Sequence, residues 1–91
     1  SDSYNVRNIN FQRYNNLKVF MTPSRDRNPH IWIRIGISEA CFLIEDGSVI
    51  TGSIGQDTKY IPKWLNKSGI REELMSTWEE ANKVEYEEEE N

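Results

Sequence analysis

The sequence has little of what builds disulfides, metal sites and membrane spans. Among its 91 residues there is one cysteine, Cys41, and one histidine, His30. A single cysteine excludes an internal disulfide, which fits a reducing compartment. No run approaches the ~20 apolar residues of a membrane-spanning helix, and the first residues, SDSYNVRN, lack the charged and then apolar order of a signal peptide. We therefore predict a cytoplasmic protein that does not bind a membrane.

Motifs for metals, phosphates and covalent catalysis are also missing. His30 and Cys41 stand eleven residues apart with no second pair of ligands beside them, whereas structural zinc needs several ligands at short spacing. The segment GSIGQDTK has two glycines but not the spacing of a phosphate-binding loop. No G-x-S-x-G nucleophile turn is present. The sequence predicts no metal site and no cofactor.

Charge is distributed unevenly along a chain whose net charge is −4. Residues 1–71 hold ten Lys or Arg against six Asp or Glu, and residues 72–91 hold one lysine against nine glutamates. The last residues, VEYEEEEN, are too polar and too self-repelling to bury an apolar surface. We predict that residues 84–91 form a disordered acidic tail. The alternative is a tail that folds back over the basic part or docks on a basic partner.

Short length limits the chain to one domain, because so small a protein buries only ~60–65 % of its unfolded surface. We assign residues 15–83 to that domain. Residues 1–14, rich in Asn and Arg with scattered aromatics, precede it as an arm or as an extra edge strand.

Four segments show the alternation of half-buried strands: residues 17–20, 30–35, 38–45 and 48–53. In the second, HIWIRI, the three isoleucines fall on one face and are expected to point to the core. Cys41 lies in the third and is expected to be a buried thiol acting as a small hydrophobe. The Asp46-Gly47 pair predicts a two-residue hairpin turn before the last strand.

The apolar period changes from two toward 3.6 after Gly55. A first helix is predicted to begin at Asp57 or Thr58, provided that Pro62 falls in its first turn. The segment KSG ends that helix, and a second is predicted from about Ile70 to Lys83.

Hairpin-linked strands followed by two amphipathic helices define the expected fold class. We predict an α+β domain, with a small antiparallel sheet of three to four strands and two C-terminal helices packed on one face. Trp64 and Trp78 lie on the apolar stripes of the helices and are expected in the core. The sequence predicts no particular oligomeric state.

Five residues form the candidate binding surface. If the isoleucines of HIWIRI face the helices, then His30, Trp32 and Arg34 share the opposite face, beside a loop that contains Arg25 and Arg27. An aromatic ring among cations suits the stacking of a base or the anchoring of a partner protein. The alternative is that Trp32 only covers the sheet beneath the N-terminal arm.

Two long segments, NPHIWIRIGISEACFLIEDGSVITGSIG and IPKWLNKSGIREELMSTWEEANK, resemble a small bacterial family classed as a domain of unknown function. Its pattern is a Pro-Pro-His-x-His strand, a glycine, an alanine-containing strand, a further strand, and then helices ending in Glu-Glu-Leu and a tryptophan. The resemblance covers about residues 16–83. The matching positions are Pro29-His30, Gly36, Glu39-Ala40, the REEL segment and Trp78.

This resemblance also shows departures from the family pattern. Asn28 replaces the first proline and Trp32 replaces the second histidine, so any acid/base pair of the family would be only half present. The resemblance implies the same α+β fold, a bacterial or phage origin, and a gene context suggestive of toxin and antitoxin pairs. That context points to partner binding.

Two hypotheses about function follow. The first, which we favour, is a non-enzymatic interaction or regulatory module, antitoxin-like in kind, that binds a protein or, as the alternative, a nucleic acid through the candidate surface. The second is a small ribonuclease-like toxin in which His30 is the general acid or base and Arg34 or Arg27 stabilises negative charge on phosphate. Acid/base cleavage of RNA ordinarily uses two proton-transfer groups, and here only Glu39, Asp26 or a tyrosine could supply the second.

Overall fold

The computed structural model describes residues 4–5, 17–22, 24 and 26–90. Its strands form one sheet in the order of the sequence, and every neighbouring pair is antiparallel. The strands are β1 (Tyr4–Asn5), β2 (Leu17–Met21), β3 (His30–Ile35), β4 (Ser38–Leu43) and β5 (Val49–Ser53). The predicted antiparallel sheet is therefore confirmed, and the two-residue β1 adds an edge next to β2.

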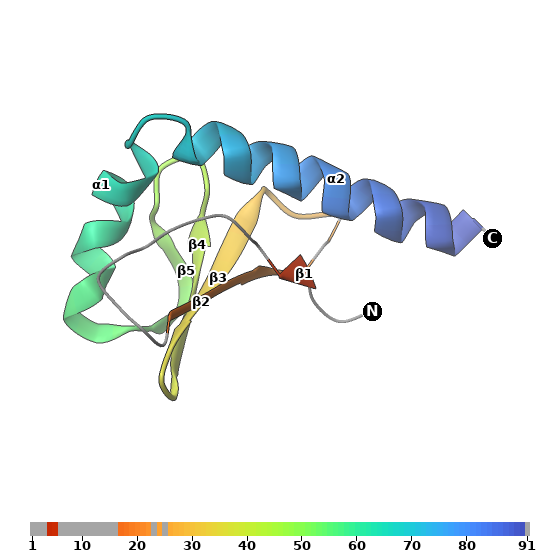
Figure 1. Cartoon of the computed structure of the whole chain (residues 1–91). Coiled ribbons are helices and arrows are strands. Elements are labelled where there is room, and N and C mark those ends of the chain that lie inside the picture. Colours follow the sequence, from red (N-terminus) through yellow and green to blue (C-terminus); the bar gives the residue numbers. More distant parts are fainter. Residues whose placement is uncertain (1–3, 6–16, 23, 25, 91) are drawn as a thin grey trace.

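Three helical elements follow the sheet: the 3-10 helix η1 (Gly55–Tyr60), α1 (Ile61–Leu65) and α2 (Ile70–Glu90). The first predicted helix is divided because Pro62 stands in the first turn of α1, where its missing N–H costs no helical hydrogen bond. In Figure 1, α2 passes over the beginning of β3 and continues past the sheet. The α+β class, with both helices C-terminal to the sheet, is confirmed.

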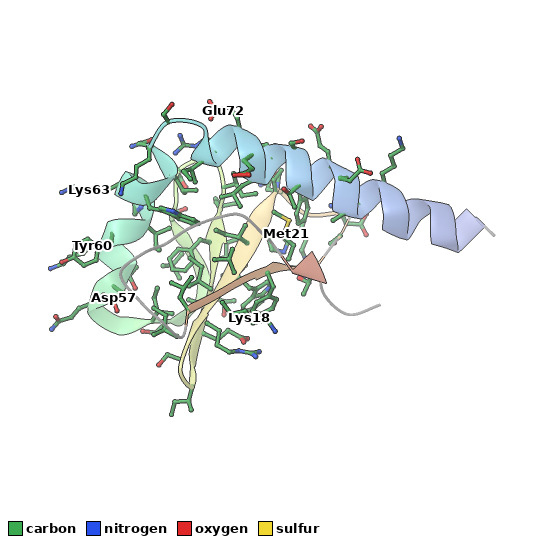
Figure 2. The ribbon with its side chains drawn as sticks, viewed as in Figure 1. Lys18, Met21, Asp57, Tyr60, Lys63 and Glu72 are labelled. Carbon is green, nitrogen blue, oxygen red and sulfur yellow. The ribbon has the colours of Figure 1, made fainter. Side chains whose placement is uncertain are left out.

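The core lies between the helices and one face of the sheet, here called the core face. Ile31 and Ile33 are fully buried there, as the alternation of HIWIRI predicted. Trp64 and Trp78 also belong to the core, which confirms the expectation for both. In Figure 2, Met21, another core residue, lies beneath α2. The opposite side of the sheet is called the outer face.

The turn between β4 and β5 is wider than the predicted two-residue hairpin. The Gly47 N–H donates to the Leu43 carbonyl, and the Ser48 N–H donates to the Asp46 carboxylate at 2.9 Å. That bond holds the pKa of Asp46 below its ordinary value. The prediction was wrong because the Leu43 N–H donates to the Ser48 carbonyl at 2.9 Å, which leaves residues 44–47 in the loop. Ile44 is buried in the core and its N–H donates to the Pro29 carbonyl, so it is held on the β3 side and does not extend the pairing with β5.

Helix α2 continues to Glu90, past the end predicted at Lys83. Residues 84–90, expected to form a disordered tail, therefore have helical backbone. Glutamate is a good helix former, and neither glycine nor proline follows Gly69. A glutamate-rich segment that is expected to be exposed to solvent can therefore also continue a helix.

Candidate binding groove

A row of four side chains crosses the outer face from β2 to β5. Strand pairing places Phe20 beside Trp32, Trp32 beside Cys41, and Cys41 beside Thr51. The first two side chains are large aromatics and the last two are small. The side chains therefore become much shorter between Trp32 and Cys41, which leaves a step in the surface of the outer face.

An open groove of about 680 Å³ lies at this step. Its lining comes from the segment between β2 and β3, from β3 and β4, and from β5. Of the described residues that line it, none belongs to η1, α1 or α2. The lining residues are Thr22, Ser24, Asp26, Arg27, Asn28, His30, Trp32, Cys41, Leu43, Ile50 and Thr51.

Trp32 forms the side of the groove nearest β2. Its indole Nε1–H donates to the Thr22 hydroxyl at 3.1 Å, and its ring lies nearly parallel to that of Phe20, with centroids 6.3 Å apart and planes 13° apart. Phe20 is not among the groove residues, so the groove lies on the other side of the indole. The hydrogen bond and the neighbouring ring fix the orientation of Trp32.

A bulge in β5 builds the opposite side. The register shifts between Cys41 and Phe42, which leaves Ile50 as an extra residue, and both Ile50 and Thr51 line the groove. Bulges redirect side chains in this way. Gly52 lies at φ +83°, and a Cβ there would be 2.3 Å from the Glu39 carbonyl oxygen. Glycine is therefore required beside the bulge.

His30 lies at one end of the groove but is not part of an exposed face as predicted. Its side chain is only 5 % exposed, because β3 begins under α2 and the imidazole meets the Trp78 ring with centroids 4.8 Å apart. The imidazole Nδ1 lies 2.8 Å from the Asn28 carbonyl. A carbonyl only accepts, so Nδ1–H is the donor. In the neutral ring Nε2 is then the basic nitrogen.

Arg34 lies outside the groove and has a carboxylate partner. Its guanidinium binds Glu39 at 2.6 and 2.8 Å and also lies 5.3 Å from the centre of the Phe20 ring. Lys18 is 5.4 Å from the same ring. Arg34 thus lies on the outer face with Phe20 and Trp32 but does not line the groove.

Arg27 is the cation that the structure places at the groove, where Asp26 accompanies it. Both residues are exposed. Arg25, the other predicted arginine of this loop, lies outside the described residues. Of the predicted surface, Arg27, His30 and Trp32 therefore line the groove, and Arg34 lies on the same face outside it.

Cys41 is buried at the base of the groove, as predicted. Burial raises the pKa of the thiol to about 11, against a smaller lowering by the charge of Arg27. The thiol is therefore protonated at neutral pH, and the thiolate is the nucleophilic form. His30 and Cys41 do not form a nucleophile ready for covalent catalysis.

Of the eleven described groove residues, the predicted surface contained three, Arg27, His30 and Trp32, and none of the four from β4 and β5. Cys41, Leu43, Ile50 and Thr51 had no distinguishing motif. The signal that finds them is strand register, since Cys41 and Thr51 lie across from Trp32 on successive strands. The bulge at Ile50 alters the alternation, so simple periodicity misplaces that residue.

Within the described part of the chain, no three His, Cys, Asp or Glu side chains gather as a metal site would require. No helix in the same part is long and apolar enough to cross a membrane. Comparison with known proteins found no matching family model, no matching curated protein and no matching solved structure. The resemblance to the bacterial family of unknown function stays a prediction.

Proposed function

We propose that this protein is an interaction module that binds a partner protein in the groove of its outer face. The observation that supports the proposal is the position of the groove: the helices pack on the core face, and the groove residues come from the sheet and the loop before β3. A half-buried tryptophan beside an arginine is a typical anchor point.

Charge favours a protein over a nucleic acid as the partner. Among the described groove residues Arg27 is offset by Asp26, and Arg34 is already bound to Glu39. Nucleic-acid affinity depends on several unneutralised cations along one surface. The net charge of −4 acts in the same direction.

We propose that binding in the groove regulates the partner protein, as an antitoxin regulates the toxin that it binds. The resemblance noted in the sequence supports this form, because members of that family are encoded beside another small protein. The family pattern has a histidine where Trp32 stands here, so this chain would bind its partner with an aromatic ring in place of an imidazole.

The test is site-specific cross-linking in native host cells. A benzophenone amino acid replaces Asn28, an exposed residue that lines the groove, or, as the control, Lys63, which is exposed on α1 and points away from the sheet in Figure 2. We expect one protein to cross-link from position 28 and not from position 63. After purification that protein should bind the wild-type chain, and Trp32→Ala should weaken binding at least tenfold, as expected of an anchor. No cross-link at position 28, or equal cross-linking from both positions, would overturn the proposal.

A ribonuclease is the second candidate because His30 and Arg27 line the same groove. A general base and a cation for the developing charge would then be close together. This function requires purified protein to cleave RNA and requires His30→Ala to abolish cleavage with the fold intact. The small exposure of His30 makes it the weaker proposal.

A further inference from the structure

The geometry points to the chemistry of the partner: the groove binds an aromatic side chain of the partner protein, stacked on the indole of Trp32. This inference rests on the proposed function and specifies what enters the groove. The ring would lie over Cys41, with Thr51 and Ile50 on its far side.

The step in side-chain size creates a place for a flat group. On the β2 side, the indole of Trp32 already has the parallel ring of Phe20 as its neighbour. On the β4 side the row continues with the small Cys41 and Thr51. A third ring inserted there would continue the series of parallel rings, with the stacking geometry that aromatic pairs prefer.

The indole is also held in place before any ligand arrives. Its Nε1–H is bound to Thr22, and Thr22 itself lines the groove. A ring with a fixed orientation loses little conformational entropy on binding, which favours aromatic anchors. Trp32 therefore differs from an exposed tryptophan that merely covers a sheet.

A partner protein is a better source of the ring than a nucleic acid or a second copy. The described groove residues include one arginine and one acid, which gives no excess of positive charge for a phosphate backbone. Among the described residues, the exposed large hydrophobic side chains are aliphatic, namely Ile37, Val49 and Ile50, so this part of a second copy offers no exposed ring. This favours a different protein as the source of the ring.

The test uses small probes and the indole N–H signal of Trp32 in two-dimensional NMR, assigned by its loss in Trp32→Phe. N-acetyl-tryptophanamide should bind about threefold to tenfold more tightly than N-acetyl-leucinamide, the gain expected from ring stacking. The Trp32 signal should move with ring-current shifts, while those of Trp64 and Trp78 stay in place. Equal affinity for the two amides, or no binding of either, would overturn the inference. Tighter binding of adenosine monophosphate would make a nucleobase the occupant and overturn it as well.

Two matched variants locate the ring. Thr51→Trp fills the groove from β5, whereas Ser53→Trp places the same side chain on the same exposed strand away from the groove residues. We expect Thr51→Trp to abolish binding of the tryptophan amide and Ser53→Trp to retain it within twofold. Equal loss in both variants would refute this location. A partner that cross-links at position 28 while the amides show no ring preference leaves the interaction proposal standing and removes only this inference.

Discussion

His30 lies on the sheet face that the strand pattern predicts, but its side chain is not exposed there as expected. Alternation along HIWIRI places it with Trp32, and both do line the groove. Its position as the first residue of β3 decides its exposure, because α2 passes there and Trp78 meets the imidazole. The sequence could predict the face of His30 but not its burial, which depends on where a helix distant in sequence crosses the sheet.

We predict that His30→Ala lowers the free energy of unfolding by about 1–3 kcal/mol. It removes a buried ring that contacts Trp78 and the hydrogen bond to the Asn28 carbonyl, and leaving that carbonyl without its donor adds to the cost. Urea denaturation would measure the change. Ile37→Ser is the control, since Ile37 is fully exposed and its replacement should alter stability by less than ~0.5 kcal/mol. Equal stability of His30→Ala and wild type would show that the imidazole contributes nothing to the fold.

Cys41 predicts how stability depends on pH in alkaline solution. The folded thiol has a pKa of about 11, whereas the ordinary pKa of a cysteine thiol is 9.0, so the unfolded chain releases this proton first as pH rises. The contribution of Cys41 is then fully present below pH 9 and is lost between about pH 9 and 11. Denaturation midpoints measured across this range should fall more steeply for wild type than for Cys41→Ala. Parallel curves for the two proteins would contradict the predicted shift.

At the scale of elements, the sequence could predict most of the fold because local patterns determine it. Alternation indicated β2 to β5, and the KSG break separated α1 from α2. The boundaries that failed were those decided by tertiary contacts: Ile44 is buried beyond the end of β4, and the connection to β5 widens accordingly. The bulge in β5 builds one side of the groove. In the sequence its only sign is Gly52, a glycine within a predicted strand.

Gly52→Ala tests the bulge, with Gly55→Ala as its matched control. Both glycines have a positive φ, +83° and +73°, but a Cβ at Gly52 would meet the Glu39 carbonyl at 2.3 Å while one at Gly55 meets nothing within 4 Å. We expect Gly55→Ala to cost about 1–2 kcal/mol from backbone strain alone. Gly52→Ala should cost at least ~1 kcal/mol more, because the strand must also move. Equal losses in thermal or urea denaturation would show that β5 shifts freely away from β4.

For the whole molecule, the groove and the acidic end belong to different parts of the architecture. The sheet presents Trp32 and Arg27 on its outer face, whereas α2 packs through Leu74, Trp78 and Ala81 and then continues past the sheet (Figure 1). Sequence reasoning separated these parts by charge alone. It assigned the acidic residues to a disordered tail because a glutamate-rich segment is expected to be exposed to solvent. Exposure does not prevent a helix from continuing when no glycine or proline interrupts it.

Removal of residues 85–91 tests what the acidic end does for the fold. The last buried residue of α2 whose side chain is described is Ala81, so we expect the truncated chain to keep its packing. Five of the removed residues are glutamates, and negative charge at a helix C-terminus is unfavourable. The melting temperature should therefore stay within about 2 °C of wild type or rise slightly, because a surface change of ~0.5 kcal/mol is the usual limit.

A longer deletion, from Trp78 to the end, is the control for that truncation. It removes a core residue that is 7 % exposed and contacts His30, and loss of a buried tryptophan costs about 3–5 kcal/mol. Such a loss is a large fraction of the stability of a small domain, so this chain should be largely unfolded in circular dichroism. If the shorter truncation were also to melt much earlier than wild type, the glutamate segment would have to pack on the domain. In that case the acidic end would belong to the fold, and its contact surface would become the next region to locate.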